Sequence, residues 1–352
     1  MTAVHHRSRF LTNDLENFVF KAIAHGQRLF QATQPQDRVK VALGGLSFEC
    51  AESDEFLKPS LQHCLFAAPN NVGQASDASV FIDYSGWHLG HQGDLLFLRD
   101  ENPLQFDTRL AKIGMRASYS QDRDAWDIFD PASRFGVRLQ PGTTATAIWE
   151  STAPLAYFCK WIAELDQKTM VHAGSVAIGG VGALLVGPGG AGKSGTVLGA
   201  MLCGFQSAGD DYTLISAQNG YRAHAVYRSV KQDPKGLARL GLVLENALNW
   251  QGKAVFRPET VGANRIVEST PISVLLVPAT GATKTRFYPI DPANAFKTLA
   301  FPTIAQLNGS NAAVFRACAA LVRDVPCFGI DLSPDKDEIA LELANFLGKL
   351  PC

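Results

Sequence analysis

The spacing of apolar side chains predicts an amphipathic helix near the start of each half of the chain. Between residues 14 and 31, apolar positions recur every three or four residues, as they do on one face of a helix. Asn13 or Asp14 could cap this helix, because both side chains accept hydrogen bonds from free backbone N–H groups. The same spacing in residues 154–165 predicts a second helix.

Between these helices the pattern changes to one that is typical of β-strands. From residue 39 to about 150, short apolar segments alternate with turn-rich stretches. We therefore expect a mostly β N-terminal domain, residues 1–150, of unknown role and with substrate recognition as one option. A Pro-Gly turn in residues 139–147 marks its boundary. The aromatic and acidic stretch at 123–136 is interpreted as a loop covering the core, with a substrate-docking edge as the alternative.

Residues 151–352 alternate strand-like and helix-like segments, which predicts an α/β domain. Residues 170–187 hold two strand-like runs separated by a Gly-Gly turn, and the second run leads directly into a glycine-rich loop. The later elements expected are a helix at 195–203, strand segments within 205–216, a buried strand at 271–279, and helices at 312–323 and 334–348 flanking a strand at 325–332.

Composition and charge exclude several classes of function. The 352 residues are 46% hydrophobic and 18% charged, with a net charge of -1, which lacks the basic excess usual in proteins that bind nucleic acid or anionic membranes. No apolar run reaches the ~18 residues of a membrane helix. The N-terminal stretch lacks the apolar core of a signal peptide. We therefore expect a cytoplasmic protein that contacts neither nucleic acid nor membrane.

The cysteines point away from a disulfide framework or a zinc site. There are seven, an odd number, and their spacing is irregular, with no C-x-x-C pair. Most of them are expected to be small buried apolar residues.

The stretch GPGGAGKS at 187–194 has the G-x-x-x-x-G-K-[ST] spacing of a phosphate-binding P-loop. Its glycines let the backbone approach an anion, and successive N–H groups can point at the anion together with a helix N-terminus. Lys193 supplies a cation for the β- and γ-phosphates, and the Ser194 hydroxyl can ligate Mg²⁺. The candidate nucleotide-binding residues are Gly187, Pro188, Gly189, Gly190, Ala191, Gly192, Lys193, Ser194 and Gly195.

The alternative is a glycine-rich turn that matches the pattern by chance. The context favours the P-loop, because a strand-like run precedes the loop and a helix-like run follows it.

Two adjacent acids, Asp210 and Asp211, follow Lys193 by 17 and 18 residues. A short helix, a reversal at Gly204 and a short strand would return them to the mouth of the loop. One carboxylate could then support Mg²⁺ and the other could accept a proton from an attacking hydroxyl. Because neighbouring side chains of a strand face opposite sides, both can serve only at a strand end or turn. A solvated Asp-Asp turn is the alternative.

The stretch from His172 to Ser216 resembles the catalytic domain of bacterial HPr kinase/phosphorylase and its HPr-kinase-like relatives, which are related to ATP-dependent phosphoenolpyruvate carboxykinases. Four features occur in the same order as in that family. They are His172, the G-K-S ending at 192–194, Gly204 after the helix, and the pair Asp210-Asp211. The resemblance is strong from about 155 to 216 and weaker towards the C-terminus.

The resemblance implies an α/β fold with a P-loop kinase domain of HPr-kinase/PEP-carboxykinase type, residues 151–352. It implies transfer of a phosphoryl group from ATP to a serine-type hydroxyl of a protein or peptide, with Mg²⁺. Lys193, Asp210, Asp211 and His172 would be the catalytic residues, and Ser194 and Asp211 the metal ligands. A homo-oligomer is compatible with the family, although the sequence itself sets no oligomeric state.

Departures from the family leave the acceptor open. The glycine-rich signature of the phosphorylase reaction is absent, and a larger residue usually stands at the position of Gly195. Arg228 and Lys231 stand in a strand-like stretch instead and are candidate phosphate or substrate contacts, with solvated surface charges as the alternative. HPr, a peptide precursor and a small molecule all remain as acceptors.

Other functions remain as alternatives. They are an NTP hydrolase or switch that drives a partner, a small-molecule kinase, and a decayed nucleotide-binding module. A separate H-x-x-H-x-x-D spacing at His88, His91 and Asp94 could hold a metal, but its neighbours favour a hairpin.

Overall fold

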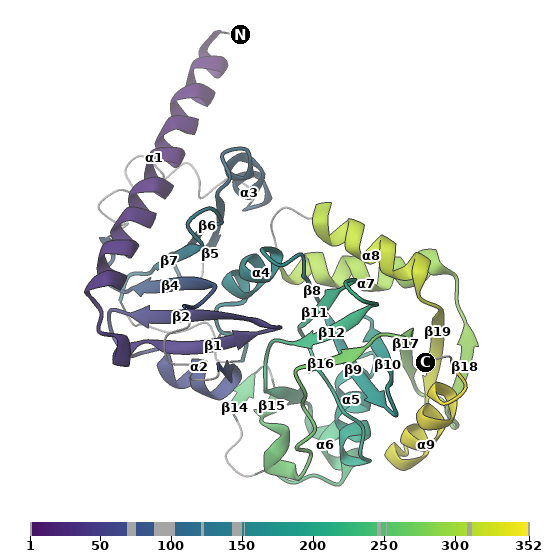
Figure 1. The fold of residues 1–352 in the computed structure, drawn as a ribbon. Helices are drawn as coiled ribbons and strands as arrows, with labels where there is room; N and C mark the ends of the chain where they lie inside the picture. The colour runs from purple at the N-terminus through teal and green to yellow at the C-terminus, as the bar shows by residue number, and fades with distance from the viewer. Residues whose placement is uncertain are drawn as a thin grey trace.

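The structure is a computed structural model with a mixed α/β fold, in which the described residues form four β-sheets (Figure 1). The residues it describes are 2–68, 75–87, 103–120, 123–142, 150, 152–244, 248–250, 252–307 and 312–350. His88, His91 and Asp94 therefore lie outside the described residues.

The N-terminal half is built on a seven-stranded mixed sheet with the order β3-β1-β2-β4-β7-β6-β5. Its strands are β1 (Val39–Leu43), β2 (Leu46–Glu52), β3 (Phe66–Ala67), β4 (Ala78–Asp83), β5 (Arg116–Ser120), β6 (Ala125–Asp130) and β7 (Phe135–Leu139). The helices of this half are α1 (Thr2–Ala32), α2 (Lys58–Cys64) and α3 (Pro103–Ala111), with a 3-10 turn at Pro35–Asp37.

Helices cover both faces of this sheet. The apolar side of α1, including Phe18 and Val19, packs on Ile128 and Val137. Residues of the opposite face pack against α2 and against α4 (Ala156–Glu164). The strands predicted for this half are therefore present. The half is nevertheless an α/β layer structure and not a mostly β domain, because the long N-terminal helix is part of its core.

The C-terminal half contains a five-stranded sheet with the order β18-β19-β17-β10-β9. Its strands are β9 (Ala173–Ile178), β10 (Val181–Val186), β17 (Val274–Thr280), β18 (Arg286–Pro289) and β19 (Cys327–Leu332). Strands β10, β17 and β19 are parallel to one another.

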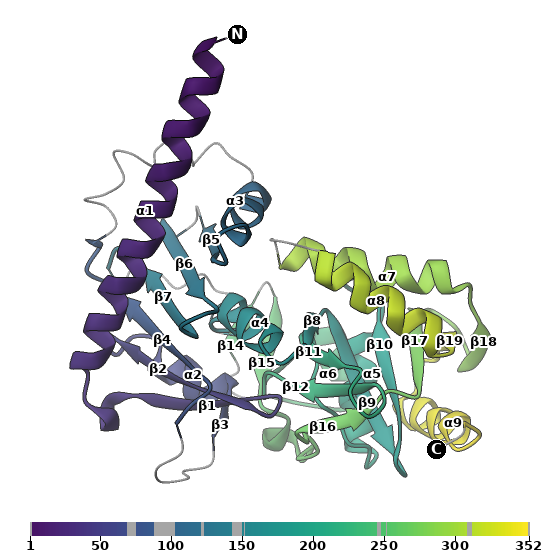
Figure 2. The same ribbon diagram turned by 45° about the horizontal axis from the view of Figure 1, so that its top comes forward.

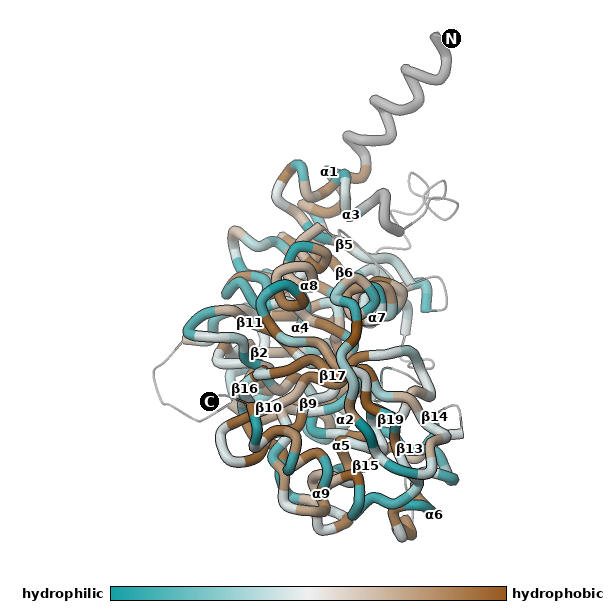
Figure 3. Tube along the Cα trace, turned by 90° about the vertical axis from the view of Figure 1, so that its right-hand side faces the viewer, coloured by the Kyte–Doolittle hydropathy of each residue, from teal (hydrophilic) through white to brown (hydrophobic). Residues whose placement is uncertain are grey.

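This sheet is buried on both faces, as parallel strands usually are. On one face, Leu185 packs in a hydrophobic cluster with residues of α5 (Lys193–Leu202) and α9 (Lys336–Leu347). On the other face, the adjacent Leu184 packs in a cluster with residues of α7 (Pro292–Gln306) and α8 (Ala312–Asp324). Figure 2 shows α7 and α8 side by side over one face, and Figure 3 shows the apolar segments gathered in the interior around β10 and β17.

Two smaller sheets complete the C-terminal half. One has the order β16-β12-β11-β8, from β8 (Thr169–Val171), β11 (Thr213–Ser216), β12 (Arg222–Ala225) and β16 (Ser269–Pro271). The other has the order β13-β15-β14, from β13 (Val230–Gln232), β14 (Leu248–Trp250) and β15 (Lys253–Phe256). Helix α6 (Pro234–Leu240) and a 3-10 turn at Pro258–Val261 accompany them.

A shared hydrophobic core joins the two halves. Phe158 of α4 packs in one cluster with Phe48 and Val80 of the first sheet and with Leu214 and Tyr227 of the C-terminal half. Figure 1 shows α4 between the two parts of the molecule.

Most predicted elements are present, with three differences. Helix α1 begins at Thr2, so the proposed caps Asn13 and Asp14 lie within it. The stretch at 123–136 is not a loop, because it contains β6 and the start of β7, and its acid Asp127 is buried and pairs with Arg138. Residues 205–209 form only isolated bridges instead of a strand. Within the described ranges, no helix is long and apolar enough to cross a membrane.

Candidate active site

The glycine-rich loop joins β10 to α5, and its backbone requires glycine at the helix start. Gly192 has a φ of 103°, in the left-handed region that side chains rarely adopt. A Cβ atom at this position would also lie 2.5 Å from Leu332. Lys193 and Ser194 occupy the first two positions of α5, where the helix presents free N–H groups to an anion.

Lys193 reaches back over the loop that precedes it. Its Nζ donates to the carbonyl of Gly187 at 2.6 Å and to that of Pro188 at 3.1 Å. Burial lowers the pKa of the ammonium, although the nearby Asp210 and Asp211 oppose this shift. The cation is therefore desolvated, which strengthens its attraction for a phosphate.

The acidic pair lies in a turn immediately before β11, and the two residues before it are hydrogen-bonded to β9. The Ser175 N–H donates to the carbonyl of Gly209 at 3.1 Å, and the Ala208 N–H to the Ser175 hydroxyl at 2.7 Å. Asp211 has a φ of 73°, in the left-handed region that Asp tolerates better than most residues. Because the chain turns here, the two carboxylates are not constrained to opposite faces of a strand, and both reach the loop.

Asp210 is a buried carboxylate with unsatisfied oxygens. Its side chain is 1% exposed, and neither oxygen accepts a well-formed hydrogen bond from the described residues. Burial raises the pKa of Asp210, and the charge of Asp211 raises it further, while the adjacent Ser194 hydroxyl and Lys193 favour the charged form. A buried carboxylate in this state needs either a proton or a cation.

Asp211 has the opposite environment, because two basic groups flank it. Lys231 Nζ donates to Oδ2 at 2.6 Å, and His172 Nδ1 lies 3.3 Å from Oδ1. Burial alone would raise the pKa of Asp211, but the charge of Lys231 and the contact with His172 lower it well below its usual range. This carboxylate is therefore ionised at neutral pH.

The loop and Asp211, but not the buried Asp210, line one cavity of about 550 Å³ with an excess of positive charge. Asp211 lines it together with the loop, Lys193, Ser194 and His172. Its five cationic side chains are Lys193, Lys231, Lys235, Arg239 and Lys253, against the two acids Asp211 and Asp233. Such a cavity is suited to a polyanion such as a nucleoside triphosphate.

Three of the cations come from segments that the sequence patterns did not indicate. Lys235 and Arg239 lie on α6, which Asp233 caps by accepting from the Gly236 N–H at 2.6 Å. Arg239 reaches the helix start beside Gly195, where a Cβ would lie 2.4 Å from its guanidinium. The sequence Asp-Pro-Lys-Gly at 233–236 does carry the N-cap residue and first-turn proline that mark the start of a helix. It does not indicate which other parts of the chain that helix contacts.

Arg228 and Lys231, which the sequence grouped together, lie in different surroundings. Lys231 enters the cavity from β13, whereas Arg228 pairs with Glu259 at 2.9 Å and lies over the ring of Phe66.

The donor set fits a single Mg²⁺ ion better than a caged metal. Within the described part of the chain, no group of three or more His, Cys, Asp or Glu side chains converges as a metal site. Mg²⁺ commonly needs only one or two protein carboxylates, with substrate phosphates and water completing its shell. The unsatisfied oxygens of Asp210 beside the Ser194 hydroxyl provide that minimum.

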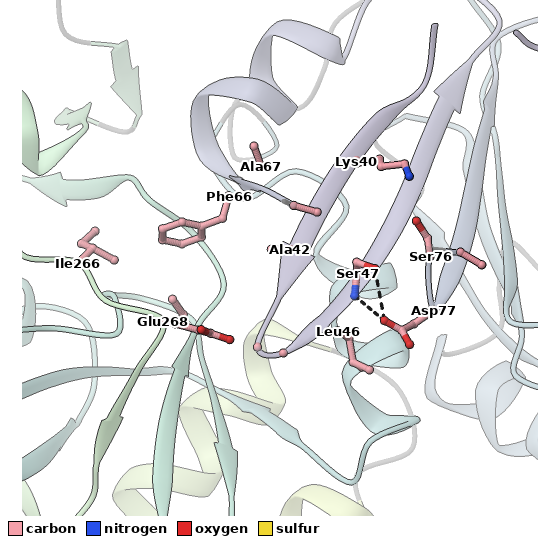
Figure 4. A pocket seen from close by; sticks show the side chains of 15 residues that line it. Lys40, Ala42, Leu46, Ser47, Phe66, Ala67, Ser76, Asp77, Ile266 and Glu268 are labelled. Atoms are coloured by element: carbon pink, nitrogen blue, oxygen red, sulfur yellow. Dashed lines mark hydrogen bonds between the residues drawn. The ribbon is translucent and has the colours of Figure 1, made fainter. Parts of the chain in front are cut away.

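A second cavity, of about 540 Å³, lies between the first sheet and residues 266–268 (Figure 4). Its charged lining is Lys40, Asp77 and Glu268, and Asp77 accepts from the Ser47 N–H at 2.8 Å. With two acids and one cation, it lacks the positive excess of the loop cavity.

No family model matches the chain, and no match was found among curated proteins. Among solved structures, the HPr(Ser) kinase/phosphatase from Coxiella burnetii is similar, with 12% identity over 51% of this chain and 97% of that chain. The TM-score of 0.27 makes this a weak structural relationship, and the chemistry of the site rests on its own residues.

Proposed function

We propose that this protein is an ATP-dependent kinase that transfers the γ-phosphoryl group to a serine-type hydroxyl of a protein or peptide. The observation that carries the proposal is the common cavity of Lys193, Ser194 and Asp211, in which phosphate-binding groups face an ionised carboxylate. Phosphoryl transfer depends mainly on positioning and on electrostatic stabilisation, and this cavity offers both.

Asp211 is the group that faces the acceptor in this proposal. Its side chain is 24% exposed and lines the cavity, whereas Asp210 is buried behind the loop. The serine oxygen forms a bond to the γ-phosphorus as the bond from that phosphorus to the β–γ bridging oxygen breaks. ADP leaves, and the serine proton passes to Asp211. Lys231 and His172 keep this carboxylate ionised and oriented.

Asp210 and Ser194 are the pair that would hold Mg²⁺. The sequence interpretation assigned the metal to Ser194 and Asp211. The buried, unsatisfied oxygens of Asp210 and its closeness to Ser194 favour Asp210 for this role. When bound, Mg²⁺ neutralises charge on the β- and γ-phosphate oxygens. Lys193 and Arg239 would neutralise the remaining phosphate charge at the N-terminus of α5.

The position of the carboxylates argues for transfer over simple hydrolysis. Many P-loop hydrolases carry an acid at the end of an apolar strand later in the chain. Here β17 lies parallel to β10, next to the loop, and ends with Ala279 and Thr280, neither of which carries a carboxylate. The Asp211 side chain lines the cavity and is partly exposed, so an acceptor hydroxyl in the cavity can reach it.

Labelled ATP tests this proposal. The protein is incubated with [γ-³²P]ATP, Mg²⁺ and a set of serine peptides, beside the variants Asp211→Asn and Arg228→Gln. We expect label in a peptide, loss of transfer in Asp211→Asn, and retained transfer in Arg228→Gln, because Arg228 pairs with Glu259. Release of phosphate to water alone would support a hydrolase, and bound but unreacted ATP a decayed module. Either result would overturn the proposal.

A further inference from the structure

A smaller cavity of about 290 Å³ shares part of its lining with the loop cavity. The residues common to both cavities are Asp211, Lys231 and Gln306. The smaller cavity is about half the volume of the larger one, at the lower end of the ~300–1,000 Å³ range of ligand pockets. It therefore has room for a side chain but not for a second nucleotide.

The lining of the small cavity differs from that of the loop cavity. Away from the shared residues it consists of Ala153, Ala156, Tyr157, Tyr212 and Leu307, none of which carries a charge at neutral pH. The surface here is suited to an apolar group.

Ring contacts support the two aromatic residues of this lining, Tyr157 and Tyr212. The Tyr212 ring contacts the Tyr227 ring edge-on with centroids 6.1 Å apart, and it meets the His172 ring at 6.3 Å. Tyr157 contacts Trp161 on α4 at 5.6 Å. The cavity is therefore supported by the core shared between the two halves of the chain.

We propose that this small cavity receives an apolar side chain of the acceptor peptide, two residues from the serine. The inference rests on the proposed function, because it needs an acceptor hydroxyl at Asp211. In an extended peptide, residues two positions apart point to the same side. A serine that reaches Asp211 therefore directs the side chain two positions away towards the same wall of the enzyme, where the apolar cavity lies.

Peptide binding tests this inference without any phosphoryl transfer. Fluorescein-labelled Gly-Ser-Gly peptides carry Phe or Asp two residues before or after the serine. Their affinity is measured by fluorescence anisotropy in the presence of Mg²⁺ and a non-hydrolysable ATP analogue. We expect a Phe peptide to bind at least about tenfold more tightly than its Asp counterpart, because burial of an aromatic side chain is worth that factor.

Two variants connect the preference to the cavity. Ala156→Phe fills the cavity and Tyr157→Ala removes one wall, so both should abolish the preference for Phe. Ala319→Phe, at an exposed position on α8, should retain it. Thermal melting and the affinity for the ATP analogue verify that each variant is folded. If Ala156→Phe proves unstable, the Tyr157→Ala variant, at a partly buried position, still gives the result.

Several outcomes would overturn the inference. One is equal binding of the Phe and Asp peptides, and another is a preference that survives in both cavity variants. A third is binding of free 2-phenylethanol, detected by saturation-transfer NMR, without preference among the peptides, which would indicate a small-molecule acceptor. Cavity-dependent preference without transfer of label would overturn the kinase proposal and leave a cavity that binds an apolar side chain of a peptide. Transfer of label without any preference would overturn only the inference, so the two failures are distinguishable.

Discussion

Lys231 Nζ lies 2.6 Å from Oδ2 of Asp211, and this contact connects β13 to the turn before β11. His172 approaches the other oxygen of the same carboxylate at 3.3 Å. The adjacent Asp210 has neither partner and is buried. Two neighbouring acids thus have pKa values shifted in opposite directions, an arrangement that recurs where enzymes divide roles between carboxylates.

Replacing Lys231 should change the pH dependence of transfer. In Lys231→Met, the pKa of Asp211 rises because the opposing charge is lost. A base acts only when deprotonated, so activity is lost as the pH falls through its pKa. The acid limb of the kcat/KM profile should therefore move to higher pH. Arg228→Gln is the matched control, because Arg228 pairs with Glu259, and its profile should not move.

Asp210→Asn should stabilise the protein in the absence of ligands. The folded-state pKa of Asp210 is raised, so its charged form destabilises the native state at neutral pH and stability increases as the pH falls through that pKa. Removing the charge should increase the free energy of unfolding by about 1–2 kcal/mol, measured by urea denaturation at pH 7.5. A decrease in stability would show that the carboxylate is satisfied in the protein.

Arg239 should contribute to nucleotide affinity although it lies far from the loop in sequence. Its guanidinium lies beside Gly195 at the start of α5, where the phosphates are expected. Arg239→Ala should weaken ATP binding by about tenfold in calorimetry, the typical cost of one charge-assisted contact. Lys349→Ala, at an exposed position near the C-terminus, serves as the control and should bind normally.

His224 should make the fold sensitive to mild acid. Burial, with the charges of Lys168 and Arg222, lowers its pKa from 6.5 to about 4. The unfolded state therefore binds a proton that the native state excludes, and stability is lost as the pH falls from about 6.5 to about 4. His224→Gln should flatten the dependence of the melting temperature on pH over this range. If the melting temperature of the variant depends on pH as steeply as that of the wild type, groups other than His224 cause the dependence.

The sequence predicted the parts of the site that are local. Lys193 and Ser194 end the loop itself, and a reversal at Gly204 was expected to return Asp210 and Asp211 to the mouth of the loop. The structure brings all of them together with His172, which pairs with Asp211. The functional roles of these residues stay predictions.

The remaining parts depend on tertiary packing. Arg239 and Lys253 come from α6 and β15, and no periodicity relates them to the loop. The acids of 123–136 misled the interpretation of this stretch as a loop. Asp127 is buried in an ion pair with Arg138, a residue outside the stretch, and a buried acid cannot be told from a solvated one in sequence. Arg228 was grouped with Lys231 because both alternate with apolar residues in a strand-like stretch, but only Lys231 lies in the short strand that faces the cavity.

A crystal structure with Mg²⁺ and a non-hydrolysable ATP analogue tests the central claim most directly. The account predicts β- and γ-phosphates within residues 187–194, Mg²⁺ between Ser194 and Asp210, and the γ-phosphate facing Asp211. Phosphates bound outside the loop, or an Asp211 carboxylate turned away from the γ-phosphate, would contradict it.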